Sequence, residues 1–273
     1  MNPNYRLVAL DMDGTLLTPD KTIDPATARD IALASEHGVQ AVFCTGRAVP
    51  ELRDYFGMVP QMRYAVCSSG AIVYDCTERK CLFRSLIPHE MLAAALAAAE
   101  KYRAMLHFLT EDESIVSASD VTHMADFHMG IYQTMFQRVA RPVESVAQEA
   151  ARHGAVAKIN LYFRSPEERS ACFQEMRQLP LVITLPEVTT LEMTAQGVSK
   201  ASGLSWLAEM LGIPMEQVIG IGDSDNDREM LRSVGLSIAM GNASADIQAQ
   251  CGMVTADNAH NGAGRAIRRA LAL

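Results

Sequence analysis

The sequence predicts an α/β fold with a mostly parallel sheet, and three features of the residue pattern lead to this prediction. Short apolar segments alternate with segments of helical periodicity at both ends of the chain. Several apolar segments end abruptly in polar residues, as at Leu10, which is followed by Asp11. The middle of the chain breaks this alternation with grouped strand-like pieces. We therefore expect a core formed by both ends of the chain and a separate inserted domain.

The N-terminal part of the chain predicts three strands and a helix. Residues 6–10 are an apolar run of the kind that parallel sheets bury on both faces. Asp24 is suited to cap a helix that begins at Pro25, because proline favours the first helical position. The helix is expected to stop at Gly38, because glycine favours the position just after the end of a helix. The two further strands are expected at 39–44 and 64–67.

The middle and C-terminal parts predict the remaining elements. The middle contains two strand–helix–strand groups, which are typical of an α+β insert. Helix and strand then alternate again, and Leu204, Leu207 and Leu211 share one face of a helix. The expected helices are 88–103, 143–153, 166–179, 199–211, 228–234 and 263–273, and the expected strands are 106–109, 114–117, 158–163, 181–185, 190–193, 217–221 and 236–240.

The composition limits the classes of partner. A net charge of −8 argues against general binding to nucleic acids or anionic membranes, because both need clustered positive charge. No run of about 18 apolar residues occurs, and the N-terminus lacks the basic lead and apolar run of a signal peptide. The six cysteines contain no CxxC pair, which is typical of reduced thiols packed as small hydrophobes. We therefore expect a cytoplasmic protein.

The strongest chemical signal is Asp11-Met12-Asp13-Gly14, directly after the first predicted strand. Two carboxylates this close are costly to bury, because each raises the pKa of the other. A divalent cation offsets that cost, and Mg²⁺ prefers oxygen ligands. Asp11 could then act as a nucleophile that forms an aspartyl-phosphate, and Asp13 could protonate the leaving group and activate water. A polar turn with solvated acids can have the same residues, so the segment alone does not decide the function.

A second acidic cluster follows the strand expected at 217–221. Within it, Asp223 is a candidate metal ligand and Asn226 could donate to a phosphate oxygen. Asp227 is placed to pair with a lysine. A type I turn and a helix N-cap also favour Asp and Asn, but two such clusters at two strand ends favour a metal-dependent site.

Two further segments could complete a phosphate-binding site. Thr45 and Gly46 follow the second predicted strand and offer a hydroxyl and backbone N–H groups to phosphate oxygens. Lys200, at the start of a predicted helix, offers a positive charge for the transition state of phosphoryl transfer. Arg47 could reach the substrate or form a surface salt bridge. Each of these signals is weak alone. Their common placement at strand and helix ends favours a phosphate-binding site.

The segments DMDGTLL, CTGR, GVSK and GDSDND, in this order, resemble the motifs of the haloacid dehalogenase superfamily. The large insert between the second and third motifs resembles the Cof-type branch, which carries a type IIB α/β cap. The resemblance covers essentially the whole chain, and it implies that Asp11 is the nucleophile and Asp13 the acid and base. It implies that Mg²⁺ is held by Asp11, the Asp13 carbonyl and Asp223, and that phosphate is bound by the Met12 backbone, Thr45, Gly46, Lys200 and Asn226.

The resemblance also implies a domain organisation. We expect a Rossmann-like three-layer core of residues 1–84 and 190–273 and an α/β cap of residues 85–189, whose closure would exclude water and select the substrate. One departure concerns Ser69, which stands before Gly70-Ala71 where the family usually has asparagine, and which leaves the substrate contact of that asparagine open. Asn242 is expected near the interface with the cap.

The predicted function is Mg²⁺-dependent hydrolysis of a small phosphomonoester, such as a sugar phosphate, a nucleotide or a phosphorylated cofactor. Asp13 favours a phosphatase over a dehalogenase, because a halide leaves without a proton. Two alternatives are a phosphosugar mutase, which would need extra cationic residues on the cap, and a non-catalytic ligand sensor. We expect a monomer or weak homo-oligomer that binds neither nucleic acid nor membrane. The histidines of 123–128 are read as cap residues rather than metal ligands.

Overall fold

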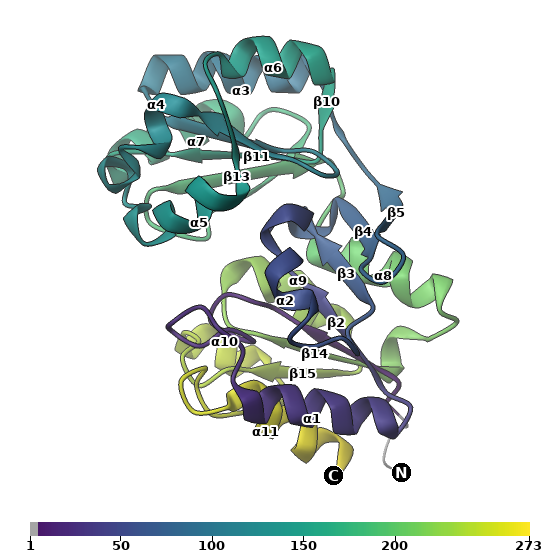
Figure 1. The fold of residues 1–273 in the computed structure, drawn as a ribbon. Coiled ribbons are helices and arrows are strands. Elements are labelled where there is room, and N and C mark those ends of the chain that lie inside the picture. The colour runs from purple at the N-terminus through teal and green to yellow at the C-terminus, as the bar shows by residue number, and fades with distance from the viewer. Residues whose placement is uncertain (1–4) are drawn as a thin grey trace. The chain divides into compact units, whose positions relative to one another are not determined.

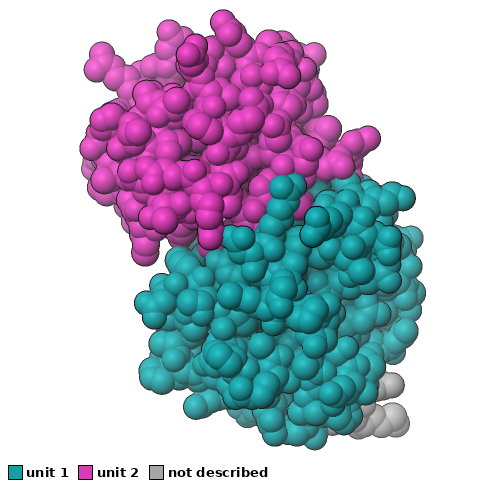
Figure 2. Space-filling model, viewed as in Figure 1, with its two compact units in different colours: residues 1–46, 53–83, 199–273 teal, residues 47–52, 84–198 magenta. Residues whose placement is uncertain are grey.

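Residues 5–273 are described by the computed structural model of the chain; residues 1–4, on which part of the expectation about a signal peptide depends, lie outside the described residues. The chain divides into two units, which Figure 2 colours separately. Unit 1 consists of residues up to 46, 53–83 and 199–273, and unit 2 consists of residues 47–52 and 84–198. The α/β class predicted from the sequence is confirmed. Within residues 5–273, no helix has both the length and the apolar composition needed to cross a membrane.

Unit 1 contains an eight-stranded sheet with the order β16-β15-β14-β1-β2-β3-β4-β5 (Figure 1). The six strands from β16 to β3 pair in parallel, and β4 runs antiparallel to β3. The strand bounds are β1 Leu7–Leu10, β2 Gln40–Cys44, β3 Tyr64–Cys67, β4 Ile72–Asp75, β5 Lys80–Arg84, β14 Val218–Gly222, β15 Leu236–Ala239 and β16 Met253–Val254.

Helices cover both faces of this sheet. On one face α1 and α11 pack against each other (Figure 1), and on the other α8 and α9 pack over an apolar core that includes Leu7 and Ala9 of β1. The Asp24 carboxylate accepts from Ala26 N–H at 2.7 Å, so the predicted cap of α1 is present. The helix bounds are α1 Pro25–Glu36, α2 Arg53–Phe56, α8 Lys200–Met210, α9 Arg228–Ser233, α10 Ala245–Gln250 and α11 Gly262–Leu271, with 3₁₀ turns η2 Ser68–Gly70, η5 Met215–Gln217 and η6 Asp225–Asp227.

Unit 2 contains a six-stranded sheet with the order β12-β13-β11-β7-β8-β9. Its central strands pair antiparallel, and only β8 and β9 of the described strands in this sheet pair in parallel. The strands are β7 Met105–Leu109, β8 Ser114–Ser117, β9 Arg141–Val143, β11 Lys158–Tyr162, β12 Leu181–Thr184 and β13 Thr190–Ala195, and a separate pair is formed by β6 Ile87–Pro88 and β10 Ala155–Val156.

The helices of unit 2 include several short elements. The longer helices α3, α6 and α7 lie within the segments that the sequence predicts as helical. The bounds are α3 His89–Tyr102, α4 Ala118–Val121, α5 Gln133–Val139, α6 Val146–His153 and α7 Pro166–Met176, with 3₁₀ turns η1 Val49–Glu51, η3 Met124–Phe127 and η4 Gly130–Tyr132.

The division of the chain differs from the predicted one in three places, the smallest of which is Arg84, expected in the core and grouped with unit 2. The strand β13, expected in the core, is hydrogen bonded to β11 and β12, and unit 2 therefore extends to Val198 instead of residue 189. Residues 47–52, also expected in the core, group with unit 2. The pattern of a short strand does not specify its partner, because the same alternation of side chains suits either sheet.

Candidate active site

The predicted catalytic segments meet at the carboxyl ends of three neighbouring strands of unit 1. In the parallel register, Leu10 of β1 lies beside Phe43 of β2 and Ile221 of β14. The N–H of Asp11 donates to the carbonyl of Ile221 at 3.0 Å, which continues the hydrogen-bond ladder one residue beyond the end of β1. The residues that follow these strands therefore share one edge of the sheet, as ligand-binding residues of parallel sheets do.

Lys200 forms the centre of the polar cluster at this edge. It is the first residue of α8, whose N-cap is Ser199. Its Nζ lies 2.5 Å from Asp11 Oδ1 and 2.7 Å from Asp227 Oδ1. The side chains of Lys200 and Asp227 are 1% and 0% exposed. Burial lowers the pKa of Lys200, but Asp11 and Asp227 raise it more, so the net pKa of the ammonium lies well above its ordinary value.

Asp227 is held at both carboxylate oxygens. Oδ1 accepts from Lys200, and Oδ2 accepts from the backbone N–H groups of Asp223 and Ser224 at 3.0 and 3.1 Å. The pairing of Asp227 with a lysine is thus present as the sequence predicts. Because both oxygens already accept hydrogen bonds, Asp227 orders the turn after β14 and is poorly placed to bind an ion.

Asp223 is fixed by residues from two other loops. Its Oδ1 accepts from the Thr15 hydroxyl at 2.8 Å, and Asn242 Nδ2 lies 3.5 Å from its Oδ2. Asn242 also donates to the Gly14 carbonyl at 2.9 Å. Gly14 has a φ of +85°, and a Cβ at this position would overlap the Asp223 carboxylate. The close approach of the two loops therefore requires glycine.

The electrostatics of the site fit a divalent cation. One carboxylate oxygen from each of Asp11, Asp223 and Asp227 lies within 4.8 Å of the others. Burial raises the pKa of Asp11 well above its ordinary value, and burial together with the nearby Asp227 raises the pKa of Asp223 to about 6. Lys200 alone does not compensate three clustered carboxylates, of which Asp11 and Asp227 are buried and Asp223 is partly buried. An all-oxygen donor set with this excess of negative charge suits Mg²⁺, and Asp11 and Asp223 are the residues that fit it.

Asp13 lies in the loop after β1 and has a cationic partner. The Nζ of Lys21 donates to Asp13 Oδ1 at 2.7 Å, and both side chains are about one third exposed. Lys21 has a φ of +59°, and its carbonyl accepts from the Tyr55 hydroxyl at 3.0 Å. Lys21 is not recognisable as a site residue from the sequence, since its contact with Asp13 depends on how the loop of residues 13–23 folds back.

The predicted phosphate-binding residues have different surroundings. Met12 is fully buried, and its carbonyl accepts from Leu17 N–H at 2.8 Å. Thr45 is 1% exposed, and its backbone is held on both sides, because its N–H donates to the Val66 carbonyl and its carbonyl accepts from Ser69 N–H. Gly46 follows Thr45 in the same loop.

Asn226 and Arg47 complete the predicted set. The Oδ1 of Asn226 accepts from Lys200 at 3.2 Å and from the Ser224 hydroxyl at 2.8 Å, so its amide nitrogen is the group oriented away from the lysine. Arg47 groups with unit 2, where its Nη1 lies 3.3 Å from the sulfur of Met135. Arg47 is 7% exposed. The contact of Arg47 with substrate and the alternative of a surface salt bridge both stay predictions.

The turn η2, which contains Ser69, is strained. Ser68 and Ser69 have φ values of +50° and +56°, in the left-handed region that costs a non-glycine residue about 1 kcal/mol or more. At Gly70, with φ +100°, a Cβ would overlap the carbonyl oxygen of Ser199. The turn thus connects the Thr45 backbone, through Ser69 N–H, to the start of the helix that carries Lys200.

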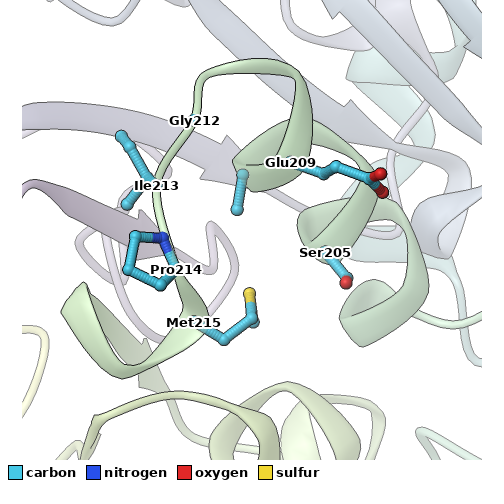
Figure 3. Close-up of a pocket in the computed structure, with 7 residues that line it drawn as sticks. Ser205, Glu209, Gly212, Ile213, Pro214 and Met215 are labelled. Atoms are coloured by element: carbon cyan, nitrogen blue, oxygen red, sulfur yellow. The ribbon is translucent and has the colours of Figure 1, made fainter.

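A pocket of about 360 Å³ lies elsewhere in unit 1, at the C-terminal end of α8 and the loop that follows it (Figure 3). Ser205, Glu209, Pro214 and Met215 are among the residues that line it. Its lining contains none of the predicted site residues, and Glu209 is its one charged side chain. A pocket whose charge is negative offers no site for phosphate, so it is separate from the proposed chemistry.

Comparison with known sequences identifies relatives over most of the chain. Residues 8–267 match the model of a family described as haloacid dehalogenase-like hydrolase. An HMP-PP phosphatase of Escherichia coli O6:H1 is 28% identical over 250 residues, which cover 90% of this chain and 87% of the relative. A second HMP-PP phosphatase, from Shigella boydii serotype 4, is also 28% identical and is covered to 91%.

Comparison with solved structures shows the same fold in proteins of low sequence identity. A haloacid dehalogenase-like hydrolase from Bacteroides thetaiotaomicron superposes with a TM-score of 0.84 at 22% identity, covering 97% of this chain and 99% of the other. A sugar phosphatase described as subclass IIB of this superfamily superposes with a TM-score of 0.83 at 22% identity, covering 97% of this chain and 98% of the other. At 22% identity, these superpositions establish a shared fold and nothing more.

Proposed function

Because the chain belongs to the haloacid dehalogenase-like hydrolases, we propose that it is a Mg²⁺-dependent phosphatase that hydrolyses small phosphomonoesters through an aspartyl-phosphate on Asp11. The family predicted from the four sequence motifs is confirmed by the match over residues 8–267. The observation that carries the proposal is the buried cluster in which Lys200 contacts both Asp11 and Asp227, beside Asp223 at the end of the neighbouring strand.

In the proposed first step, an oxygen of Asp11 attacks the phosphorus atom and the bond to the leaving oxygen breaks. Asp11 is fixed at the end of β1 by the hydrogen bond of its N–H to Ile221, which supports in-line positioning of the carboxylate. Lys200, together with the backbone of Met12 and the Thr45–Gly46 loop, stabilises the negative charge on the transferring phosphoryl group. Asn226 supplies a further donor through its amide nitrogen.

Asp13 carries the proton in both steps of the proposal. It protonates the leaving alkoxide in the first step, and in the second it takes a proton from the water that attacks the aspartyl-phosphate. The position of Asp13, two residues after Asp11 in the same loop, supports this role. Lys21, at 2.7 Å from Asp13 Oδ1, orients the carboxylate.

Mg²⁺ would be held by the carboxylates of Asp11 and Asp223 and, by resemblance to the family, by the Asp13 carbonyl. Bound there, it would neutralise charge on the phosphoryl oxygens and on the clustered carboxylates. The residues of this chain that prepare the site are Thr15 and Asn242, which orient Asp223, and Asp227, which orders the turn and fixes Lys200.

The substrate is proposed to be a small phosphorylated metabolite, such as a sugar phosphate, a nucleotide or a phosphorylated cofactor. The HMP-PP phosphatase relatives support a small phosphorylated molecule as the substrate. Unit 2 is proposed to act as the α/β cap, which is supported by the subclass IIB neighbour of the same fold. A cytoplasmic location is part of the proposal and is supported by the six cysteines, all of which are free thiols.

A Mg²⁺-supplemented screen of purified protein against phosphorylated metabolites and p-nitrophenyl phosphate tests the proposal. Wild-type protein should release inorganic phosphate only with a divalent cation, and Asp11→Asn should release none. As a control, Asp225→Asn changes an exposed aspartate in the same acidic cluster and should retain the activity. Undiminished turnover by Asp11→Asn would refute the nucleophile, and isomerised sugar phosphate without released phosphate would favour a mutase.

A further inference from the structure

The loop that follows β1 contains a tight hairpin turn at residues 18–22. The N–H of Lys21 donates to the Thr18 carbonyl at 2.9 Å, and the N–H of Thr18 donates to the Thr22 carbonyl at 2.8 Å. In a three-residue hairpin loop of this kind the last loop residue is left-handed, a conformation that favours glycine. Here that residue is Lys21, with a φ of +59°.

A lysine is an unfavourable residue at this position, because the left-handed conformation brings its Cβ too close to the backbone. The contact of Lys21 with Asp13 does not offset this strain. The Nζ of Lys21 lies 2.7 Å from Asp13 Oδ1, but the two side chains are 30% and 32% exposed. An ion pair this exposed contributes little to the free energy of unfolding, since water screens both charges. A strained residue that adds little stability indicates a functional constraint.

A second residue holds the strained backbone of Lys21 in place. Tyr55, on α2 and 34 positions along the chain, donates its hydroxyl to the Lys21 carbonyl at 3.0 Å. Tyr55 belongs to unit 1 and is 8% exposed, and a buried hydroxyl is costly without an acceptor. The hydrogen bond therefore fixes the Lys21 peptide, and the fixed peptide sets the direction in which the lysine side chain leaves the turn.

The backbone of Asp13 is joined to the same turn. Asp13 forms a β-bridge with Leu17, and Leu17 forms another with Ile23 on the far side of the turn. The Leu17 carbonyl also accepts from Asn258 Nδ2 at 2.8 Å, which ties the base of the turn to the rest of unit 1. Asp13 and Lys21 thus belong to one connected structure, in which the ammonium approaches the carboxylate from a fixed direction.

We infer that Tyr55 and Lys21 are positioning residues for Asp13. Tyr55 holds Lys21 in its left-handed conformation, and the Lys21 ammonium holds the Asp13 carboxyl group in the orientation that proton transfer requires. Both roles rest on the proposed function, in which Asp13 carries the proton in both steps. Neither residue is proposed to touch the phosphoryl group. A catalytic group misplaced by about 1 Å can lose about 100-fold in rate, so the loss of this contact has a measurable effect.

Two aryl phosphates measure the orientation of Asp13, because their leaving groups need its proton to different extents. Phenolate is a stronger base than p-nitrophenolate, so hydrolysis of phenyl phosphate depends more on proton transfer to the leaving oxygen. We expect Lys21→Met to lower the ratio of kcat/KM for phenyl phosphate to that for p-nitrophenyl phosphate about 10-fold, and Tyr55→Phe to lower it about 3-fold.

Three further variants show whether the effect belongs to this ion pair. Lys21→Arg keeps the positive charge and should lower the ratio less than Lys21→Met does. Lys101→Met and Tyr102→Phe remove an ammonium and a hydroxyl from exposed contacts with Glu175, and both should keep the wild-type ratio.

A double-mutant cycle separates positioning from a general effect on the fold. Because Tyr55 is proposed to act through Lys21, adding Tyr55→Phe to Lys21→Met should lower the ratio no further. Lys21→Gly removes the backbone strain together with the ammonium, so its Tm should equal or exceed that of the wild type while the ratio falls as in Lys21→Met.

An unchanged ratio in Lys21→Met would overturn the inference, and so would a further fall when Tyr55→Phe is added to it. A Lys21→Gly variant with a lower Tm than the wild type and an unchanged ratio would show that the ion pair serves stability alone. The proposed function fails separately, if the wild type releases phosphate from neither ester in the presence of Mg²⁺, and the positioning roles then fall with it.

Discussion

The ammonium of Lys200 lies 2.5 Å from Asp11 Oδ1, although the two residues are 189 positions apart in the sequence and both are almost fully buried. The contact joins the end of β1 to the first residue of α8. Because the same ammonium also contacts Asp227, one positive charge compensates two carboxylates from two different loops. The contact between Lys200 and Asp11 therefore stabilises unit 1. It also sets the local charge at the position proposed for the phosphoryl group.

Replacing Lys200 by methionine should destabilise the fold and abolish turnover. The change leaves two buried carboxylates without a counter-charge, which costs about 3–5 kcal/mol in the free energy of unfolding, and it removes a donor worth about 10²–10³-fold in kcat. Urea denaturation and p-nitrophenyl phosphate hydrolysis measure the two effects. Lys101→Met, at an exposed pair with Glu175, is the matched control and should change stability by less than about 0.5 kcal/mol. Equal effects of the two variants would contradict the role of Lys200.

Asp227→Asn should also destabilise the protein, although the shape of the side chain is retained. The amide nitrogen must face either Lys200 or the N–H groups of Asp223 and Ser224, and donors then oppose donors. We expect a loss of about 2–3 kcal/mol by urea denaturation. Asp225→Asn, at a residue whose side chain is 61% exposed, should lose less than about 1 kcal/mol. A stable Asp227→Asn variant would show that the hydrogen bonds to Asp227 are dispensable.

Two glycine variants separate backbone strain from steric overlap. Gly38 has a φ of +77° with open space around the Cβ position, so Gly38→Ala should lose only the left-handed penalty of about 1 kcal/mol. Gly70 has a φ of +100°, and a Cβ there overlaps the Ser199 carbonyl, so Gly70→Ala should lose about 3 kcal/mol or more and should shift the helix that carries Lys200. Thermal unfolding of both variants tests this, and a smaller loss at Gly70 than at Gly38 would contradict the close packing of the turn.

The stability of the protein should depend on pH through His107. Its pKa lies at about 3 in the folded protein, because the ring is buried, and at its ordinary value of 6.5 in the unfolded chain. Between these values only the unfolded chain binds the proton, so His107 should lower the free energy of unfolding by about 1.4 kcal/mol per pH unit as the pH falls from 6 to 4, with no contribution above pH 7.

Comparing wild type with His107→Gln by urea denaturation from pH 4 to 7 isolates this contribution, since the difference between their stabilities should shrink as the pH falls. His37→Gln, at an exposed histidine, is the control substitution. If the free energy of unfolding changed equally with pH in His107→Gln and in the wild type, the ring would be protonated in the folded protein.

The sequence predicts the strand ends of unit 1 well, and the reason is local. An apolar run that stops at an acid, as at Leu10 and Asp11, is visible without knowledge of the fold, and parallel pairing then brings such ends together. The structure places Lys200, Asp227 and Asn226 in contact accordingly. The catalytic and metal-binding roles of these residues stay predictions that the variants above test.

Other features depend on contacts that no local pattern specifies. The partner of β13 is set by its pairing with β11 and β12, and the contact of Lys21 with Asp13 is set by the path of a loop. The helices α4 and α5 were not predicted, because segments this short show little periodicity. The alternation of polar and apolar residues in β11 normally indicates a solvated face, whereas here Lys158 and Asn160 are buried.

The covalent role of Asp11 is tested most directly by the intact mass of the Asp13→Asn variant mixed with p-nitrophenyl phosphate and Mg²⁺. The p-nitrophenolate leaves without a proton, but the second step lacks its base, so the phosphoenzyme should accumulate. We predict a Mg²⁺-dependent phosphoryl adduct on the peptide that contains Asp11, which is absent when Asp11→Asn is added to the same variant. Turnover without an adduct, or an adduct on another residue, would contradict the central claim.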